Sequence, residues 1–246
     1  MRTARRGSSI AFLAAVVPFM FVGTGCGPNA CVGGIGVCKH TRLASVYVVI
    51  DPSGSQAHRV KRQAADVQTI ARTGHAEITI VRLRERPAAS TIVTRVELPK
   101  IDTSDPNAFA KRTALLEELD GVVRRALAHR TNASDHWGAL DLVRDDARQR
   151  GIGSGYRVYV LGDSEPCVPG VCWTREVPTP KKAVAQVRNA YAALSYRGEK
   201  VTFVMGGDGG SGHKPPAYVA HLKAAVLAVC KSAGADSCKA TTEVAS

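Results

Sequence analysis

Apolar positions follow two different periods along the chain from about residue 43 onward. Short apolar runs, continuous or alternating, are typical of strands, and longer segments with apolar residues three or four apart are typical of helices. The predicted strands are 46–50, 77–83, 91–98, 156–161 and 200–205. The predicted helices are 57–73, 105–129, 137–150, 180–196 and 216–233. Because Pro99 directly follows the strand at 91–98, we expect that strand at an edge of a sheet.

The order of these elements predicts the fold class. Strands alternate with helices, and a helical crossover is the usual link between parallel strands. We therefore expect an α/β fold with a doubly wound, mostly parallel sheet and helices on both faces. Residues 43–240 are enough for one domain with a substantial hydrophobic core.

The first 25 residues have the features of an export signal. Arg2, Arg5 and Arg6 precede an apolar run at 10–22 that is short for a membrane span. Thr24-Gly25-Cys26 resembles the lipobox of bacterial lipoproteins, although Gly23 stands where that motif usually has Leu. The resemblance implies a lipid on Cys26, which would anchor an exported protein to a cell membrane. Cleavage without lipidation is the alternative.

The other six cysteines also indicate export. They form three close pairs in the sequence: Cys31 with Cys38, Cys167 with Cys172, and Cys230 with Cys238. Such spacings allow local disulfides in an oxidising compartment, and pairing of nearest neighbours is the simplest arrangement. A zinc site is the alternative, but the chain has no Cys-x-x-Cys motif to support it. Residues 26–42 are Gly-rich and are expected to form a short tether.

The chain is basic, with a formal net charge of +12. A basic exported domain can favour anionic lipid, polysaccharide or nucleic acid. However, the Lys and Arg residues are scattered, and aromatic residues make up only 5% of the chain. Nucleic-acid binding normally needs a clustered basic stripe or aromatic stacking residues. We therefore predict a solvated basic surface and no nucleic-acid partner.

A polar motif directly follows the apolar strand at 46–50. Asp51-Pro52-Ser53-Gly54-Ser55 offers a carboxylate and two hydroxyls, and its Pro and Gly keep the segment out of regular structure. Oxygen donors of this kind suit a hard cation such as Mg²⁺. Ordinary turn chemistry is the alternative reading. The motif's position favours a site, because ligands of open α/β sheets bind beyond the carboxyl ends of the strands.

Two other loops have suitable partners. Ser134 lies just before the predicted helix at 137–150, and Asp163 follows the predicted strand at 156–161. The carboxyl ends of adjacent parallel strands converge at one edge, so Asp51 and Asp163 are able to share an ion.

The three motifs together resemble the metal-ion-dependent adhesion site of von Willebrand factor type A (vWA) domains. Asp51-x-Ser53-x-Ser55 is similar to the family's first motif, Ser134 to its Thr, and Asp163 to its later Asp. Two departures stand out: Ser replaces Thr, and Asp163 stands in Gly-Asp-Ser rather than Thr-Asp-Gly. The resemblance covers roughly residues 43–235.

The resemblance implies a role for each of these residues. Ser53, Ser55 and Ser134 would bind Mg²⁺ or Mn²⁺ directly, and Asp51 and Asp163 would act directly or through water. Few charged ligands would leave positive charge on the ion. An acidic group of a protein or another envelope ligand would then complete the coordination.

Two neighbouring features allow more than one reading. His136 and Trp137 follow Ser134 and are able to line the ligand face, although we expect Trp137 to pack and His136 to be solvated. The Gly-rich segment 206–214 has P-loop glycine spacing, but His213 stands where a P-loop has Lys. We therefore predict a loop near the site rather than a nucleotide site.

The sequence favours a metal-dependent binding protein over two alternatives. One is a structural envelope domain with a vestigial metal site. The other is a metal-dependent hydrolase. No second Asp stands two residues after Asp51, and the chain has no Gly-x-Ser-x-Gly motif, so we do not predict an enzyme.

Overall fold

The computed structural model describes residues 43–53, 57–84, 90–129, 131, 134–191, 194–205 and 214–244. The predicted leader and tether lie outside these residues, and so do Cys26, Cys31, Cys38 and Ser55. Within the described residues, no helix combines the length and the apolar character needed to cross a membrane.

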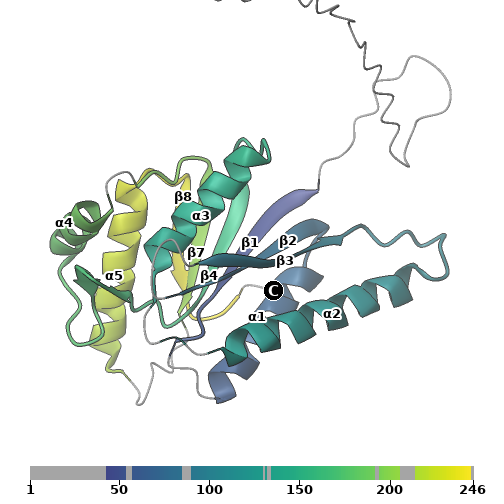
Figure 1. Ribbon diagram of the computed structural model, residues 1–246, viewed down its shortest axis with the longest axis horizontal. Helices are drawn as coiled ribbons and strands as arrows, with labels where there is room; N and C mark the ends of the chain where they lie inside the picture. The colour runs from purple at the N-terminus through teal and green to yellow at the C-terminus, as the bar shows by residue number, and fades with distance from the viewer. Residues whose placement is uncertain are drawn as a thin grey trace, which may run out of the picture. The chain divides into compact units, whose positions relative to one another are not determined.

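A six-stranded sheet forms the centre of the domain (Figure 1). Its strands in spatial order are β3 (Thr91–Leu98), β2 (Ala76–Arg82), β1 (Ala44–Ile50), β4 (Tyr156–Gly162), β7 (Glu199–Met205) and β8 (Ser237–Thr241). All neighbouring strands are parallel except the β2–β3 pair. The predicted mostly parallel sheet is therefore confirmed, and β3 lies at an edge.

Helices cover both faces of this sheet, as predicted from the order of elements. They are α1 (Ala57–Arg72), α2 (Ala108–Ala128), α3 (His136–Gln149), α4 (Pro180–Ala190) and α5 (Pro216–Ser232). Buried side chains of α1 and α2 pack on one face, and those of α3, α4 and α5 pack on the other. Figure 1 shows α1 beside α2 and α4 beside α5. A small hairpin, β5 (Cys167–Val168) and β6 (Val171–Cys172), stands apart from the main sheet.

Strand β1 is buried on both faces because it lies in the middle of the sheet. Val48 belongs to the core shared with α1 and α2, whereas Val49 belongs to the core shared with α3, α4 and α5. The register pairs Ile50 of β1 with Leu161 of β4. Both strands therefore end at the same level, which brings the residues that follow them together.

Two segments differ from the sequence-based prediction. Helix α4 ends at Ala190 rather than near Tyr196, because Tyr191 has an extended backbone and Tyr196 is fully buried in the core. Strand β8 was not predicted because Ser-Cys-Lys-Ala-Thr has no apolar run or alternation. The Cys230–Cys238 disulfide links this edge strand to α5.

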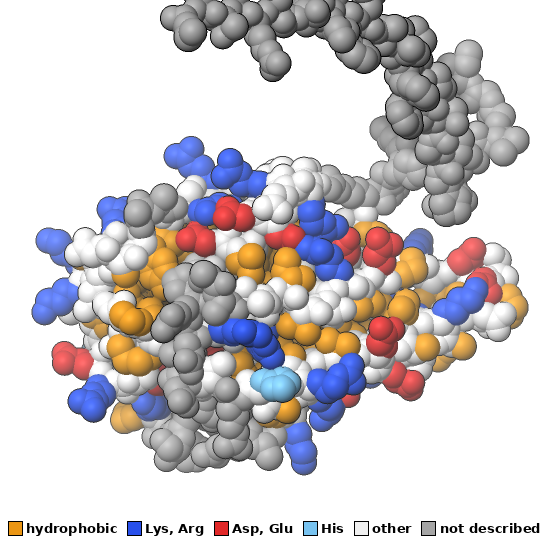
Figure 2. Space-filling view, in the orientation of Figure 1, with side chains coloured by type: hydrophobic (Ala, Val, Ile, Leu, Met, Phe, Trp, Pro, Cys, Tyr) orange, Lys and Arg blue, Asp and Glu red, His pale blue; other side chains and the backbone are white. Residues whose placement is uncertain are grey.

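Positive and negative side chains are interspersed on the surface. On the face shown in Figure 2, Lys and Arg side chains are spread among Asp, Glu and apolar groups, without a single basic stripe. This distribution agrees with a solvated basic surface.

Candidate metal centre

Asp51 is the buried centre of the site. Asp51 is 2% exposed, and Gln63 of α1 forms hydrogen bonds with its backbone. The Asp51 N–H donates to Gln63 Oε1 at 3.0 Å, and Gln63 Nε2 donates to the Asp51 carbonyl at 2.7 Å. The Ser53 N–H donates to Asp51 Oδ1 at 2.8 Å, which folds the motif back on itself. The first predicted loop therefore presents its oxygens to one point.

Ser134 joins this loop from a distant part of the chain. Its Oγ lies 2.6 Å from Ser53 Oγ, and 3.0 and 3.2 Å from the two Asp51 carboxylate oxygens. The Ser134 carbonyl accepts a hydrogen bond from the Cys167 N–H at 3.1 Å, so the β5–β6 hairpin supports the loop. The sequence-based pairing of Ser134 with the first motif agrees with this geometry.

The oxygen spacing fits a small octahedral ion. Ligands at 2.0–2.1 Å from Mg²⁺ in octahedral geometry lie about 2.9 Å from one another. The separations of 2.6–3.2 Å between Ser134 Oγ and the side-chain oxygens of Ser53 and Asp51 bracket that value. The donor set consists of a carboxylate and neutral hydroxyls, which Mg²⁺ and Mn²⁺ prefer.

Gly162 allows β4 to approach Asp51 closely. Its φ is +142°, and a Cβ at this position would lie 2.8 Å from the Asp51 Cβ. Any side chain here would push against the buried carboxylate. The Gly of the Gly-Asp-Ser context, which departs from the vWA pattern, therefore has a clear steric role.

Asp163 follows Gly162 and completes the acidic part of the site. Its Oδ1 accepts from the Glu165 N–H at 2.9 Å, and its Oδ2 lies 3.2 Å from Nη1 of Arg59 on α1. Burial and the nearby Asp51 carboxylate raise the pKa of Asp163 to about 6. The charged carboxylate at this position therefore gains from a neighbouring cation.

His136 also belongs to the cluster, so it lines the site, and the prediction of a solvated side chain is wrong. It is 1% exposed rather than solvated, and its Nε2 lies 3.5 Å from Asp51 Oδ2. One ligand atom each from Asp51, His136 and Asp163 lies within 4.8 Å of the others, so the three form a possible metal-binding group. The signal in the sequence was a histidine two residues after Ser134, at the start of a helix.

Asp51 and His136 shift each other's protonation. Burial alone would raise the pKa of Asp51, but His136 and the Ser53 hydrogen bonds bring it below its ordinary value. Burial alone would lower the pKa of His136, but the Asp51 carboxylate raises it. The pair therefore favours a carboxylate facing a protonated imidazole when no ion is bound.

The helix that follows Ser134 is firmly anchored. Asp135 caps α3, with its Oδ1 accepting from the Gly138 N–H at 2.8 Å and from the Tyr191 hydroxyl. Trp137 is 1% exposed and packs edge-to-face on Trp173 and Phe203, as expected for a core residue. These contacts hold the Ser134 loop in place.

The rim of the site carries further charge. Glu165 Oε1 lies 3.3 Å from Lys214 Nζ, and Lys214 also lies over the Tyr218 ring. The Ser164 hydroxyl is buried and has no hydrogen-bond partner among the described residues. The Gly-rich loop next to Lys214, from 206 to 213, lies outside the described residues.

Searches of protein-family models and of curated proteins find no match to the chain. Solved structures do resemble it in fold. Proximal thread matrix protein 1 from the mussel byssus has a TM-score of 0.44 and 12% identity over 82% of this chain and 44% of its own. The pilus adhesin SpaC from Lactobacillus rhamnosus GG has a TM-score of 0.45 and 10% identity over 82% of this chain and 28% of its own.

A von Willebrand factor type A protein from Catenulispora acidiphila is a weak structural neighbour. Its TM-score is 0.30, with 15% identity over 76% of this chain and 43% of that one. The chain thus spans less than half the length of each of these structures. These likenesses concern the fold, and function depends on the site itself.

Proposed function

We propose that the protein binds a divalent cation, Mg²⁺ or Mn²⁺, and uses it to capture a carboxylate of a protein or another envelope ligand. The observation that carries the proposal is the convergence on Ser134 Oγ, which lies 2.6–3.2 Å from the Ser53 hydroxyl and from both Asp51 carboxylate oxygens. Asp163 lies close enough to take part directly or through water. Ser55 is assigned to the same ligand set from the sequence motif.

The residues of the site have different roles in binding the ion. Ser53 and Ser134 offer neutral oxygens, and Asp51 orients both through its hydrogen bonds. A bound ion would supply an electrophilic centre for an anionic oxygen. Because few of its ligands carry charge, positive charge remains for a partner's Glu or Asp side chain to neutralise.

One observation favours a second candidate. The guanidinium of Arg59 already pairs with Asp163. A domain in which that ion pair replaces a metal would be a structural envelope module with a vestigial site. Metal titration separates the two candidates.

The proposal places the domain outside the cytoplasm on a lipid anchor at Cys26. The sequence of the leader and the two disulfides, Cys167–Cys172 and Cys230–Cys238, support export. Feeding cells a palmitate analogue should label the wild type and not Cys26→Ala. Equal labelling of both would remove Cys26 as the anchor.

Thermal unfolding tests the ion. The wild-type domain should melt higher in Mg²⁺ than in EDTA, because a ligand that binds only the folded state stabilises it. At a hundredfold excess over its dissociation constant the gain is about 2.7 kcal/mol. Asp51→Ala and Ser134→Ala should lose this gain, while Asp102→Asn, a change at an exposed position, should keep it. An equal metal response in wild type and Asp51→Ala would refute the site.

Capture from a cell-envelope extract tests the use of the ion. Partners held in Mg²⁺ should be released by EDTA and return when Mg²⁺ is restored. Asp163→Ala should weaken the capture. If EDTA and Asp163→Ala both leave the binding unchanged, the second candidate, a structural envelope module with a vestigial site, would be favoured.

A further inference from the structure

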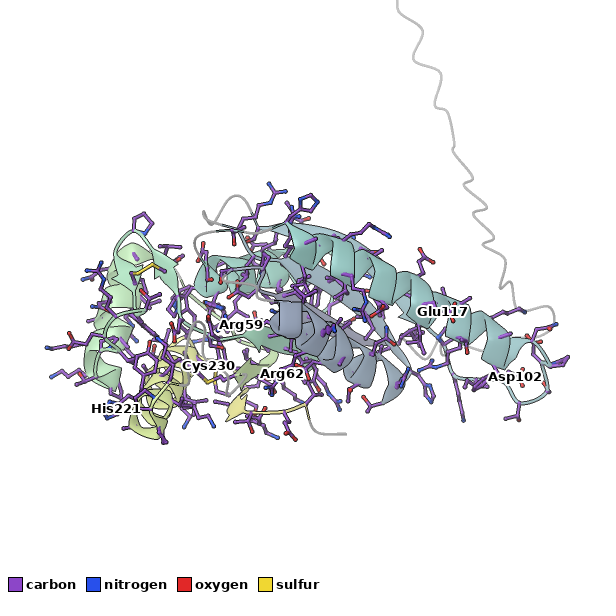
Figure 3. All side chains as sticks on the ribbon, turned by 90° about the horizontal axis from the view of Figure 1, so that it is seen from below. Arg59, Arg62, Asp102, Glu117, His221 and Cys230 are labelled. Atoms are coloured by element: carbon purple, nitrogen blue, oxygen red, sulfur yellow. A yellow bond between two sulfur atoms is a disulfide. The ribbon has the colours of Figure 1, made fainter. Side chains whose placement is uncertain are left out.

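Arg59 places a permanent positive charge inside the candidate metal centre. It lies in the first turn of α1 (Figure 3), and its side chain is only 10% exposed. Its Nη1 lies 3.2 Å from Oδ2 of Asp163, a member of the possible metal-binding group. A guanidinium does not lose its proton in proteins, so this charge is present at every working pH.

The negative charge of two neighbouring carboxylates explains why a cation is favourable at this site. Asp51 is buried, Asp163 has a side chain 15% exposed, and their ligand atoms lie within 4.8 Å of each other, so two negative charges there repel. His136 lies beside Asp51, and Arg59 lies beside Asp163. Each acid therefore has a cationic group from the chain when no ion is bound.

A divalent ion changes this balance. An ion bound between the carboxylates would stand a few ångströms from the Arg59 charge, and like charges at that distance repel in a buried site. The ion and the guanidinium would also share the Asp163 carboxylate as a ligand. The guanidinium and the divalent ion therefore each weaken the binding of the other to Asp163.

We propose that Arg59 is a tethered counter-ion that competes with the divalent cation for Asp163 and so lowers the affinity of the site for metal. The inference rests on the proposed function, because it describes the same ion. Metal and partner carboxylate should then bind cooperatively, since an incoming negative charge offsets the repulsion from Arg59, and this coupling is reciprocal.

The test measures Mn²⁺ and Mg²⁺ affinity of purified domains by titration calorimetry, together with melting temperatures in EDTA. Arg59→Gln should bind metal about tenfold more tightly than wild type or better, because a full charge next to the ion is removed. Arg59→Lys keeps the charge and should stay near wild-type affinity. In EDTA, Arg59→Gln should melt below Arg59→Lys, since Asp163 loses its cation.

Arg62, one turn further along α1, provides the matched control (Figure 3). Its guanidinium donates to the Thr242 carbonyl. Arg62→Gln should leave metal affinity unchanged. A change in Arg62→Gln as large as that in Arg59→Gln would mean a general charge effect and would overturn the inference.

The remaining outcomes separate the inference from the proposed function. Equal metal affinity in wild type and Arg59→Gln overturns the inference and leaves the metal site intact. Binding by Arg59→Gln alone supports the inference and shows that Arg59 occupies the site in the wild type. Absence of binding in both overturns the inference and the proposed metal site together.

Discussion

At the scale of single residues, the site depends on very close packing around one carboxylate. Asp51 contacts Ser53, Ser134 and His136 through its side chain, and Gln63 holds its backbone. Gly162 closes the remaining side without a Cβ. These neighbours fix the position of the buried Asp51 carboxylate, so the side chain would not have to move to meet an ion.

This packing makes Gly162→Ala a sharp test. The new Cβ would meet the Asp51 Cβ at 2.8 Å, and a φ of +142° is strained for any residue with a side chain. We expect a destabilisation of about 1–3 kcal/mol from the backbone alone and a loss of the Mg²⁺-dependent rise in melting temperature. Gly170→Ala is the control, because φ is +86° there and the nearest contact is 3.8 Å away at Ala190. It should lose stability but keep its metal response; a full metal response in Gly162→Ala would contradict the packing argument.

At the scale of elements, two short disulfide-linked segments have different tasks. The β5–β6 hairpin is closed by Cys167–Cys172 and supports the Ser134 loop through the Cys167 N–H. The Cys230–Cys238 bridge ties β8, an edge strand of the sheet, to α5 (Figure 3). One bridge therefore serves the site, and the other serves the edge of the sheet.

Removing each bridge should show this division. The double change Cys167→Ala with Cys172→Ala should weaken Mn²⁺ binding, because the loop that carries Ser134 loses its support. The double change Cys230→Ala with Cys238→Ala should cost about 2 kcal/mol of stability and leave Mn²⁺ affinity unchanged. Calorimetric titration and thermal unfolding measure the two effects. A loss of affinity from the second pair alone would reverse the assignment.

At the scale of the whole molecule, stability should depend on buried acids far from the metal centre. Glu199 at the start of β7 is fully buried, and the Tyr156 hydroxyl donates to its Oε1 at 3.0 Å. Burial raises the pKa of Glu199 from an ordinary 4.5 to about 8. The folded state therefore holds this proton more tightly than the unfolded chain, and stability falls as pH rises from 4.5 to about 8.

Glu199→Gln should remove this part of the pH dependence. At pH 4 the variant should match the wild type, because Glu199 is mostly protonated in both the folded and the unfolded chain. At pH 8.5 it should be more stable by about 4–5 kcal/mol, because the wild type must either bury a charge or hold a proton that the unfolded chain has released. Melting temperatures in EDTA across this range measure the difference, with the exposed Glu117→Gln as a pH-independent control. A difference that does not grow with pH would exclude a buried ionisable Glu199.

The sequence by itself determined the α/β class, the mostly parallel sheet and the first metal motif. These features depend on local periodicity, because a strand buried on both faces needs a continuous apolar run, as at 46–50. Ser134 and Asp163 were also predictable, since loops at the carboxyl edge of a parallel sheet converge by topology. Strand β8 was not, because a short edge strand held by a disulfide needs little apolar character.

Only the tertiary structure decided how charge is arranged in the site. Arg59 and His136 lie in different helices; the place of His136 beside Ser134 allowed it to line the site, but nothing in the local sequence indicates that Arg59 reaches Asp163. The end of α4 was decided in the same way, because Tyr196 enters the core after the chain turns at Tyr191. Local pattern determines which elements form. Long-range packing determines which buried charges meet, because an unpaired buried charge is too costly to leave without a partner.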